Sequence, residues 1–65
     1  MKERLERLKA VRVIIKSNRI DSQDQLLQLL AEQGFSVTQA TLSRDLKYLK
    51  VGKVSDGHAG YYYTV

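Results

Sequence analysis

The chain has 65 residues, with no cysteine and a single histidine, so it has room for one small domain and for no disulfide or thiolate metal site. Eleven Lys and Arg residues against seven Asp and Glu residues give a net charge of +4, which favours a polyanionic partner. The basic residues gather toward the two ends of the sequence, whereas residues 20–33 carry three anions and no cation.

The first predicted element is a helix over about residues 2–17. Its apolar side chains recur at helical spacing, at Leu5, Leu8, Val11, Ile14 and Ile15. Glu3 and Arg7 are four residues apart, a favourable spacing for an ion pair on a helix. Asn18 is expected to end the helix in the left-handed conformation, which Asn tolerates better than most residues.

A short extended segment with Ile20 turned inward leads to a second helix, which begins at Ser22. Ser22 and Gln25 have the spacing of a capping box, in which the serine oxygen accepts from the third helical amide and the glutamine side chain reaches back. A wide apolar face follows, at Leu26, Leu27, Leu29 and Leu30. Gly34 is expected to cap the C-terminal end, with Phe35 packing back on the helix.

A third helix is predicted to begin after Thr38, whose hydroxyl is a suitable N-cap. Val37 is placed to pack on Leu42, four positions into this helix. The inward-facing stripe consists of Leu42, Leu46 and Leu49. Gly52 is expected to end the run, so two helices follow one another across a tight turn.

The remaining residues predict a β-hairpin, with strands at residues 53–55 and 61–65 and a turn over residues 56–60. A lone hairpin is marginal in water, so this one must pack on the helices. The order is helix, short strand, helix, turn, helix, hairpin. It predicts a mainly α domain with a small β-hairpin: a winged helix-turn-helix of three helices plus a wing, filling residues 1–65.

The third helix presents a second set of side chains opposite its leucines, because successive residues are rotated by about 100°. These side chains are small, hydrogen-bonding or cationic: Ala40, Ser43, Arg44 and Lys47, flanked by Gln39 and Thr41. A helix that enters the DNA major groove needs small residues for close approach and polar groups for base edges. Arg44 is expected to contact guanine and Gln39 adenine. Phosphate contacts are expected from Lys47, Ser43 and Thr41.

Such a face is more often simply solvated, and here the neighbouring helix, turn and hairpin favour the nucleic-acid interpretation. The cations of the first helix are open to the same two interpretations: most keep the helix soluble, and a few contact phosphate. They are Lys2, Arg4, Arg7, Lys9, Arg12 and Lys16.

In the wing, Lys53 at the base and His58 at the tip are candidates for a contact with the DNA backbone or the minor groove. The favoured interpretation of His58 is an exposed turn residue with no ligand role. Tyr61 and Tyr63 alternate to one face and are expected in the core, whereas Tyr62, on the other face, is a candidate for a phosphate contact.

Enzyme signals are absent, since the sequence has no glycine-rich phosphate loop, no nucleophile beside a histidine and no metal-ligand spacing. We therefore expect no catalytic residue, no metal and no cofactor in this domain. No apolar run approaches the ~20 residues that cross a bilayer, and the N-terminus lacks an apolar secretion signal. A cytoplasmic protein with no membrane partner is expected.

The ten residues 37–46, VTQATLSRDL, closely resemble the arginine repressor family. The resemblance extends over nearly the whole chain, and its other matching positions are Arg12–Ile15, Ile20, Gln23–Leu26, Gly34, Lys53, Val54, Tyr61 and Tyr63. The run around Ser43 and Arg44 is its specific part, because the leucine pattern alone is common to many helical domains.

This resemblance implies a regulator of arginine biosynthesis and catabolism, in which Ser43 and Arg44 contact operator DNA and Gln39 and Thr41 lie on the same surface. Members of the family recognise AT-rich palindromic operators. They also carry a C-terminal domain that binds L-arginine as corepressor and assembles hexamers. That domain is absent from these 65 residues, so we expect this domain to be monomeric and not to bind arginine.

The leading hypothesis is therefore sequence-specific binding of double-stranded DNA. The alternative is a winged helix used as a protein-interaction module, which an apolar or acidic outer face of the third helix would favour. RNA binding is a third possibility, and competition between structured RNA and duplex DNA distinguishes it.

Overall fold

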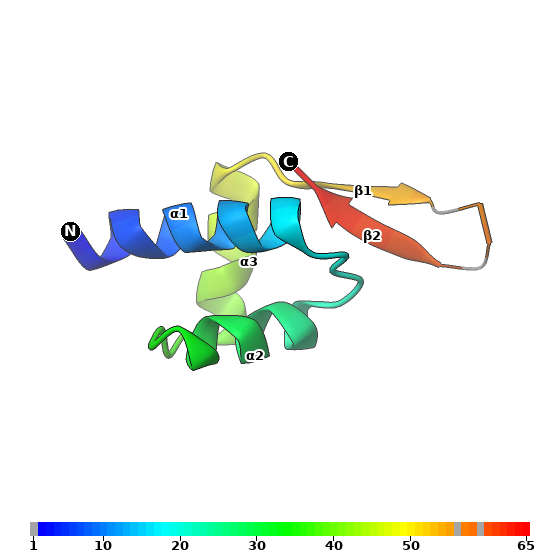
Figure 1. Ribbon diagram of the computed structural model, residues 1–65. Coiled ribbons are helices and arrows are strands. Elements are labelled where there is room, and N and C mark those ends of the chain that lie inside the picture. Colours follow the sequence, from blue (N-terminus) through cyan, green and yellow to red (C-terminus); the bar gives the residue numbers. More distant parts are fainter. Residues whose placement is uncertain (1, 56, 59) are drawn as a thin grey trace.

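The computed structural model describes residues 2–55, 57–58 and 60–65. Its elements are α1 (Lys2–Ser17), α2 (Gln23–Glu32), α3 (Gln39–Tyr48), β1 (Gly52–Ser55) and β2 (Tyr61–Thr64). Figure 1 shows the three helices gathered together and the hairpin projecting from them as a wing, in a molecule of 38 × 21 × 21 Å. This arrangement confirms the predicted winged helix-turn-helix.

Helix α1 covers the predicted residues, but two details of the prediction were wrong. Asn18 is not left-handed, since Lys50 is the one non-glycine residue with a positive φ in the described parts of the chain. Asn18 instead donates twice to the Ile14 carbonyl, from its amide at 3.0 Å and from its side-chain Nδ2 at 3.1 Å. Leu5 is 63% exposed, because the first turns of α1 extend beyond the other helices, and the buried stripe begins at Leu8.

Helix α2 has the predicted caps at both ends. The Ser22 Oγ accepts from the Gln25 amide at 3.2 Å, and the Gln25 Oε1 reaches back to the Asp21 amide, one residue before the N-cap. At the other end Gly34 has φ +92°, and the Phe35 amide donates to the Leu30 carbonyl at 2.9 Å. This is the expected glycine-terminated Schellman arrangement.

Helix α3 begins as predicted but ends earlier. The Thr38 Oγ1 accepts from the Thr41 amide at 3.2 Å and caps the helix. The C-cap is Leu49, and Lys50 follows it with φ +57°, while the Val51 amide donates to the Leu46 carbonyl at 2.9 Å. Gly52 was predicted to end the run and instead begins β1. Val51 packs against the core, so the chain turns out of the helix at Lys50, two residues before Gly52.

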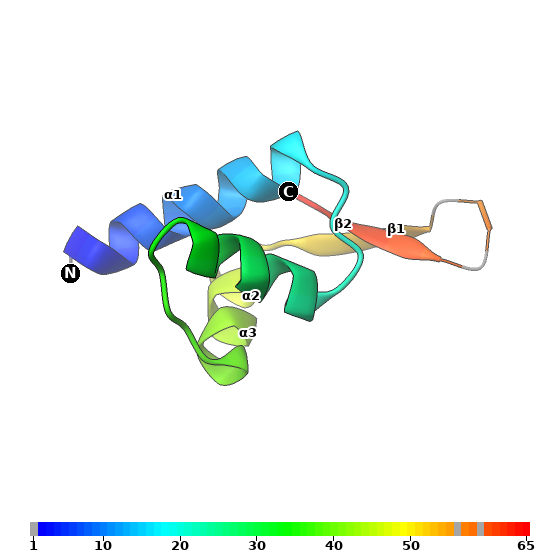
Figure 2. The same cartoon turned by 60° about the horizontal axis from the view of Figure 1, so that its bottom comes forward.

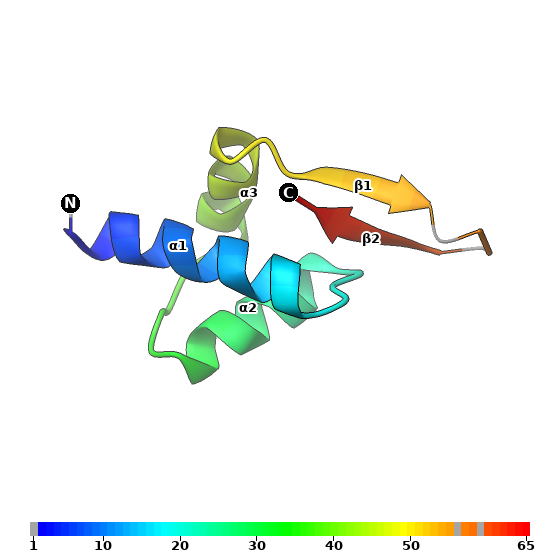
Figure 3. The same ribbon diagram turned by 45° about the horizontal axis from the view of Figure 1, so that its top comes forward.

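The hairpin is held to the helices through its second strand. The strands pair in the register Gly52 with Thr64 and Ser55 with Tyr61. Tyr63 is buried, and its amide donates to the Ile20 carbonyl at 2.8 Å. The segment around Ile20 is not a strand, and this hydrogen bond is the backbone link between it and β2. Figure 3 shows the hairpin beside the C-terminal half of α1, away from its N-terminal end.

One apolar cluster joins all three helices to the wing. Its buried members are Val11, Ile14, Ile15, Ile20, Leu26, Leu30, Leu42, Leu46 and Tyr63. Leu49, Phe35 and Val37 are half-buried against it, as predicted for the helix ends. Tyr61 was expected in the core as well, but it is 42% exposed and meets the Tyr63 ring edge-on at 6.4 Å. Within the predicted turn, Asp56 and Ala59 lie outside the described residues.

Candidate nucleic-acid interface

Seven residues form the principal predicted DNA contact, namely Lys53 of the wing and six residues that α3 carries on its outer side. The leucines of the opposite side are fixed in the core, so these six side chains face outward. The exposed ones are Gln39, Ala40, Arg44 and Lys47, and the half-buried ones are Thr41 and Ser43. Figure 2 shows α2 and α3 both below α1, and Figure 1 shows α3 crossing α2, in the helix-turn-helix arrangement. The structure therefore brings these six side chains together on one surface, which we call the outer face of α3.

The inner side of α3 holds an ion pair that the sequence analysis missed. Asp45 is 4% exposed, and it accepts from the Arg7 Nε at 2.6 Å and from the Arg7 Nη2 at 3.0 Å. The pKa of Arg7 is raised, chiefly by this hydrogen bond and against the opposing effect of burial. Asp45 lies between Leu42 and Leu46 on the inward stripe, so its position was a signal that a buried acid would need a cation.

This pairing determines the charge of the outer face. Asp45 is the one acid of α3, and its carboxylate lies against α1 rather than outward. Arg44 and Lys47 are exposed on the opposite side, with no acid of the same helix beside them. The outer face of α3 is therefore positive, as an anionic ligand requires.

The two hydroxyl groups of the outer face have partners of different kinds. The Thr41 Oγ1 accepts from the Thr38 Oγ1 at 3.1 Å, within α3 and its cap. The Ser43 Oγ donates to the Gln23 Oε1 of α2 at 3.3 Å. Gln23 thus belongs to this surface, although no pattern in the sequence pointed to it, because the contact joins two helices.

Lys53, the seventh predicted residue, lies on the wing over two aromatic rings. Its Nζ is 4.6 Å from the centroid of Tyr61 and 5.7 Å from that of Tyr63, within the range of a cation–π interaction. A polar hollow of about 270 Å³ connects Lys53 with Gln39 at the start of α3. Its other lining residues are Ser22, Gln23, Asp24, Tyr61 and Tyr63. The base of the wing is therefore continuous with the outer face of α3.

Among the cations of α1, Arg7 is held by Asp45. Arg4 is exposed, and its guanidinium lies 5.2 Å from the centroid of the exposed Tyr48 ring. Lys9, Arg12 and Lys16 are exposed, whereas the side chain of Lys2 is outside what is described. Arg7 is one of the candidates for phosphate contact, and its half-buried pairing with Asp45 removes it from that group.

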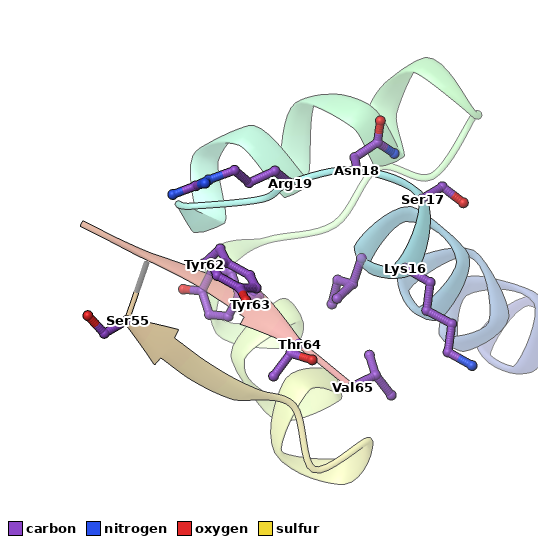
Figure 4. Close-up of a pocket in the computed structure, with 10 residues that line it drawn as sticks. Lys16, Ser17, Asn18, Arg19, Ser55, Tyr62, Tyr63, Thr64 and Val65 are labelled. Atoms are coloured by element: carbon purple, nitrogen blue, oxygen red, sulfur yellow. The ribbon is translucent and has the colours of Figure 1, made fainter. Parts of the chain in front are cut away.

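Tyr62, also a candidate for phosphate contact, lies on the other face of the wing. Its ring is half-buried with the Arg19 guanidinium 5.2 Å from its centroid, and Figure 4 shows the two side chains facing each other. They line a hollow of about 780 Å³ together with the end of α1, and no residue of α3 lines it. Tyr62 is therefore separated from the outer face of α3. His58 is exposed, as predicted for a turn residue.

In residues 2–55, 57–58 and 60–65, no three His, Asp or Glu side chains gather closely enough to hold a metal ion. None of the described helices has the length and apolarity needed to span a membrane.

Comparison with known proteins places this geometry in context. Residues 2–65 match the protein family described as "Arginine repressor, DNA binding domain". The arginine repressors of Parabacteroides distasonis and Phocaeicola vulgatus are 54% and 51% identical over all 65 residues, which are 44% and 41% of their own lengths. The arginine repressor of Bacillus subtilis is 46% identical over 55 residues, 85% of this chain and 37% of that protein. The chain spans about two fifths of the length of these relatives.

Proposed function

Since the chain belongs to the arginine repressor family, and matches its DNA-binding domain, we propose that it binds double-stranded DNA sequence-specifically by inserting the outer face of α3 into the major groove. The observation that carries this proposal is the division of charge on α3. Its acid, Asp45, is buried against Arg7, while Arg44 and Lys47 are exposed on the opposite side. The outer face of α3 is neither apolar nor acidic, and this counts against a protein-interaction module.

Each exposed side chain has a role that fits its chemistry. Arg44 has the fork of donors that matches the O6 and N7 of guanine, and the Gln39 amide matches the N6 and N7 of adenine. Ala40 permits close approach of the helix to the base edges. Lys47 and Thr41 hold phosphates, which position the domain without reading the sequence. Lys53, at the base of the wing, reaches the backbone beside the groove.

For the longer proteins of the family we extend the proposal. We propose that they repress genes of arginine metabolism in the cytoplasm with L-arginine as corepressor, and that they act as hexamers on AT-rich palindromic operators. The relatives are named arginine repressors, which supports the link to arginine. A single domain binds one half-site weakly, because linked subunits would supply the avidity.

Binding measurements on selected DNA test the proposal. Duplexes enriched by the chain from a random-sequence library are labelled, and fluorescence anisotropy compares each with a scrambled duplex and with an RNA hairpin. We expect the selected duplex to bind most tightly. We also expect log K to fall with log salt at a slope of about −2 to −3, because two or three cations contact phosphates. Equal affinity for selected and scrambled duplexes contradicts sequence-specific reading, and tighter binding of the RNA contradicts the choice of ligand.

Amide chemical-shift mapping with the same duplexes locates the surface. Shifts concentrated in residues 39–47 support the outer face of α3. Shifts confined to α1 or to the far face of the wing contradict it.

A further inference from the structure

We infer that Gln23 of α2 is a positioning residue that fixes the hydroxyl of Ser43 as a hydrogen-bond acceptor toward DNA. Ser43 then reads an exocyclic amino group of a base in the major groove, N6 of adenine or N4 of cytosine, and does not hold a phosphate. This inference rests on the proposed function, because it assigns one contact of the same surface.

The geometry joins the two residues across the helix-turn-helix. Gln23 is the first residue of α2, and Ser43 lies in the middle of α3. The Ser43 Oγ donates to the Gln23 Oε1 at 3.3 Å, and both side chains are half-buried, where water competes less with the bond. Gln23 also lines the polar hollow beside Gln39, so it lies at the edge of the outer face of α3.

The direction of this hydrogen bond limits what Ser43 can offer to DNA. An amide oxygen only accepts, so the single hydroxyl proton of Ser43 is the one used in the bond to Gln23. What remains on the Ser43 Oγ is lone pairs, which need a donor. In the major groove the donors are N6 of adenine and N4 of cytosine, whereas the edge of guanine and the phosphates present acceptors. This differs from the expectation that Ser43 holds a phosphate.

Thr41 on the same helix shows the opposite arrangement. Its Oγ1 accepts a hydrogen bond from the Thr38 Oγ1, and among the described residues no acceptor takes the Thr41 hydroxyl proton. Thr41 therefore remains a donor, which suits a phosphate oxygen. The two hydroxyls of one helix face thus acquire different specificities from their neighbours.

Four variants separate positioning from folding and from general affinity. Gln23→Ala removes the acceptor and frees the Ser43 proton, whereas Gln23→Glu keeps an acceptor and adds a charge that DNA repels. Ser43→Ala removes the reading group itself. Gln28→Ala is the matched control, because Gln28 is an exposed glutamine of the same helix. Thermal unfolding of each variant shows that the fold persists.

The parent and each variant are first used to select duplexes from a random-sequence library. The position whose preference Ser43→Ala abolishes is then rebuilt with its amino group deleted, as purine for adenine or 2-pyrimidinone for cytosine. We expect the deletion to weaken the parent, Gln28→Ala and Gln23→Glu roughly 5- to 150-fold. It should leave Ser43→Ala unchanged and weaken Gln23→Ala less than about threefold. Gln23→Glu should bind every duplex more weakly while keeping the parent's base preference.

Three results overturn the inference. If Ser43→Ala weakens all duplexes equally, Ser43 holds a phosphate, although the parent's sequence preference would still support the proposed function. If Gln23→Ala keeps the full penalty for amino-group deletion, Gln23 does not position Ser43. If the parent selects no sequence at all, the proposed function fails together with the inference.

Discussion

The two sides of α3 use arginine in opposite ways. On the inner side the Arg7 side chain is 15% exposed and donates twice to the buried Asp45, so its charge serves the packing of α1 on α3. On the outer side Arg44, the neighbour of Asp45 in the sequence, is exposed and directed away from the core. The comparison teaches that burial and pairing, more than residue type, separate a structural cation from one available to a ligand.

The largest effect is expected from Arg7→Ala. Removing the cation leaves Asp45 buried without its partner, which costs about 3–5 kcal/mol of unfolding free energy. Urea denaturation followed by helical circular dichroism measures the loss. A 65-residue domain has little stability to lose, so a variant that is already partly unfolded without urea is also consistent with the prediction.

Two controls test whether the pairing is responsible. Arg12→Ala, which removes an exposed arginine of the same helix, should change the free energy of unfolding by less than about 0.5 kcal/mol. The double variant Arg7→Met, Asp45→Leu should recover most of the loss, because an apolar pair of similar size can replace a buried ion pair. A loss below about 1 kcal/mol in Arg7→Ala would remove the contrast between the two sides of α3.

The next effect concerns binding and arises on the outer side. Arg44→Ala should weaken binding to a selected duplex by about 1–3 kcal/mol and relax the preference at one base pair, with the free energy of unfolding almost unchanged. Fluorescence anisotropy at fixed salt measures the affinity. If the variant binds as tightly as the parent, or if it unfolds as readily as Arg7→Ala, the outer side is not a separate binding surface.

The smallest effect is expected just after α3, at a cation that belongs neither to the Arg7–Asp45 ion pair nor to the outer face of α3. Lys50 has φ +57°, which is strained for a residue with a Cβ atom. Lys50→Gly relieves this strain, partly offset by the greater freedom of glycine in the unfolded chain, and should stabilise the domain by about 0.5–1 kcal/mol. Lys9→Gly, inside α1, should instead destabilise it by about 1 kcal/mol. Urea denaturation compares the two, and a destabilised Lys50→Gly variant would show that the lysine side chain has a packing role.

Features that depend on adjacent residues could be predicted from the sequence. The caps at Ser22 and Thr38 and the turn at Gly34 are set by a few neighbouring groups, and the structure has all three. The composition of the outer face of α3 followed from the leucine stripe, because the period of a helix places all other positions once one side is known. The family resemblance then gave that face its expected ligand.

Features that depend on contacts between elements were missed. The partner of Asp45 lies on α1, and helical spacing within one element says nothing about which cation will meet it. The bond between Ser43 and Gln23 also joins two helices. The end of α3 was placed at Gly52 from a preference for glycine, but the packing of Val51 on the core imposed the left-handed conformation on Lys50. In each case tertiary packing determined the outcome.

The wing packs on the helices through the buried ring of Tyr63. Tyr63 shares the core with Ile20 and donates to its carbonyl, and the strand that carries Lys53 is paired with Tyr63. A change in the volume of the side chain at position 20 is therefore transmitted to the position of Lys53. Genetic screens for altered operator affinity should accordingly recover substitutions at Ile20 that never touch the nucleic acid, in addition to substitutions at the groove.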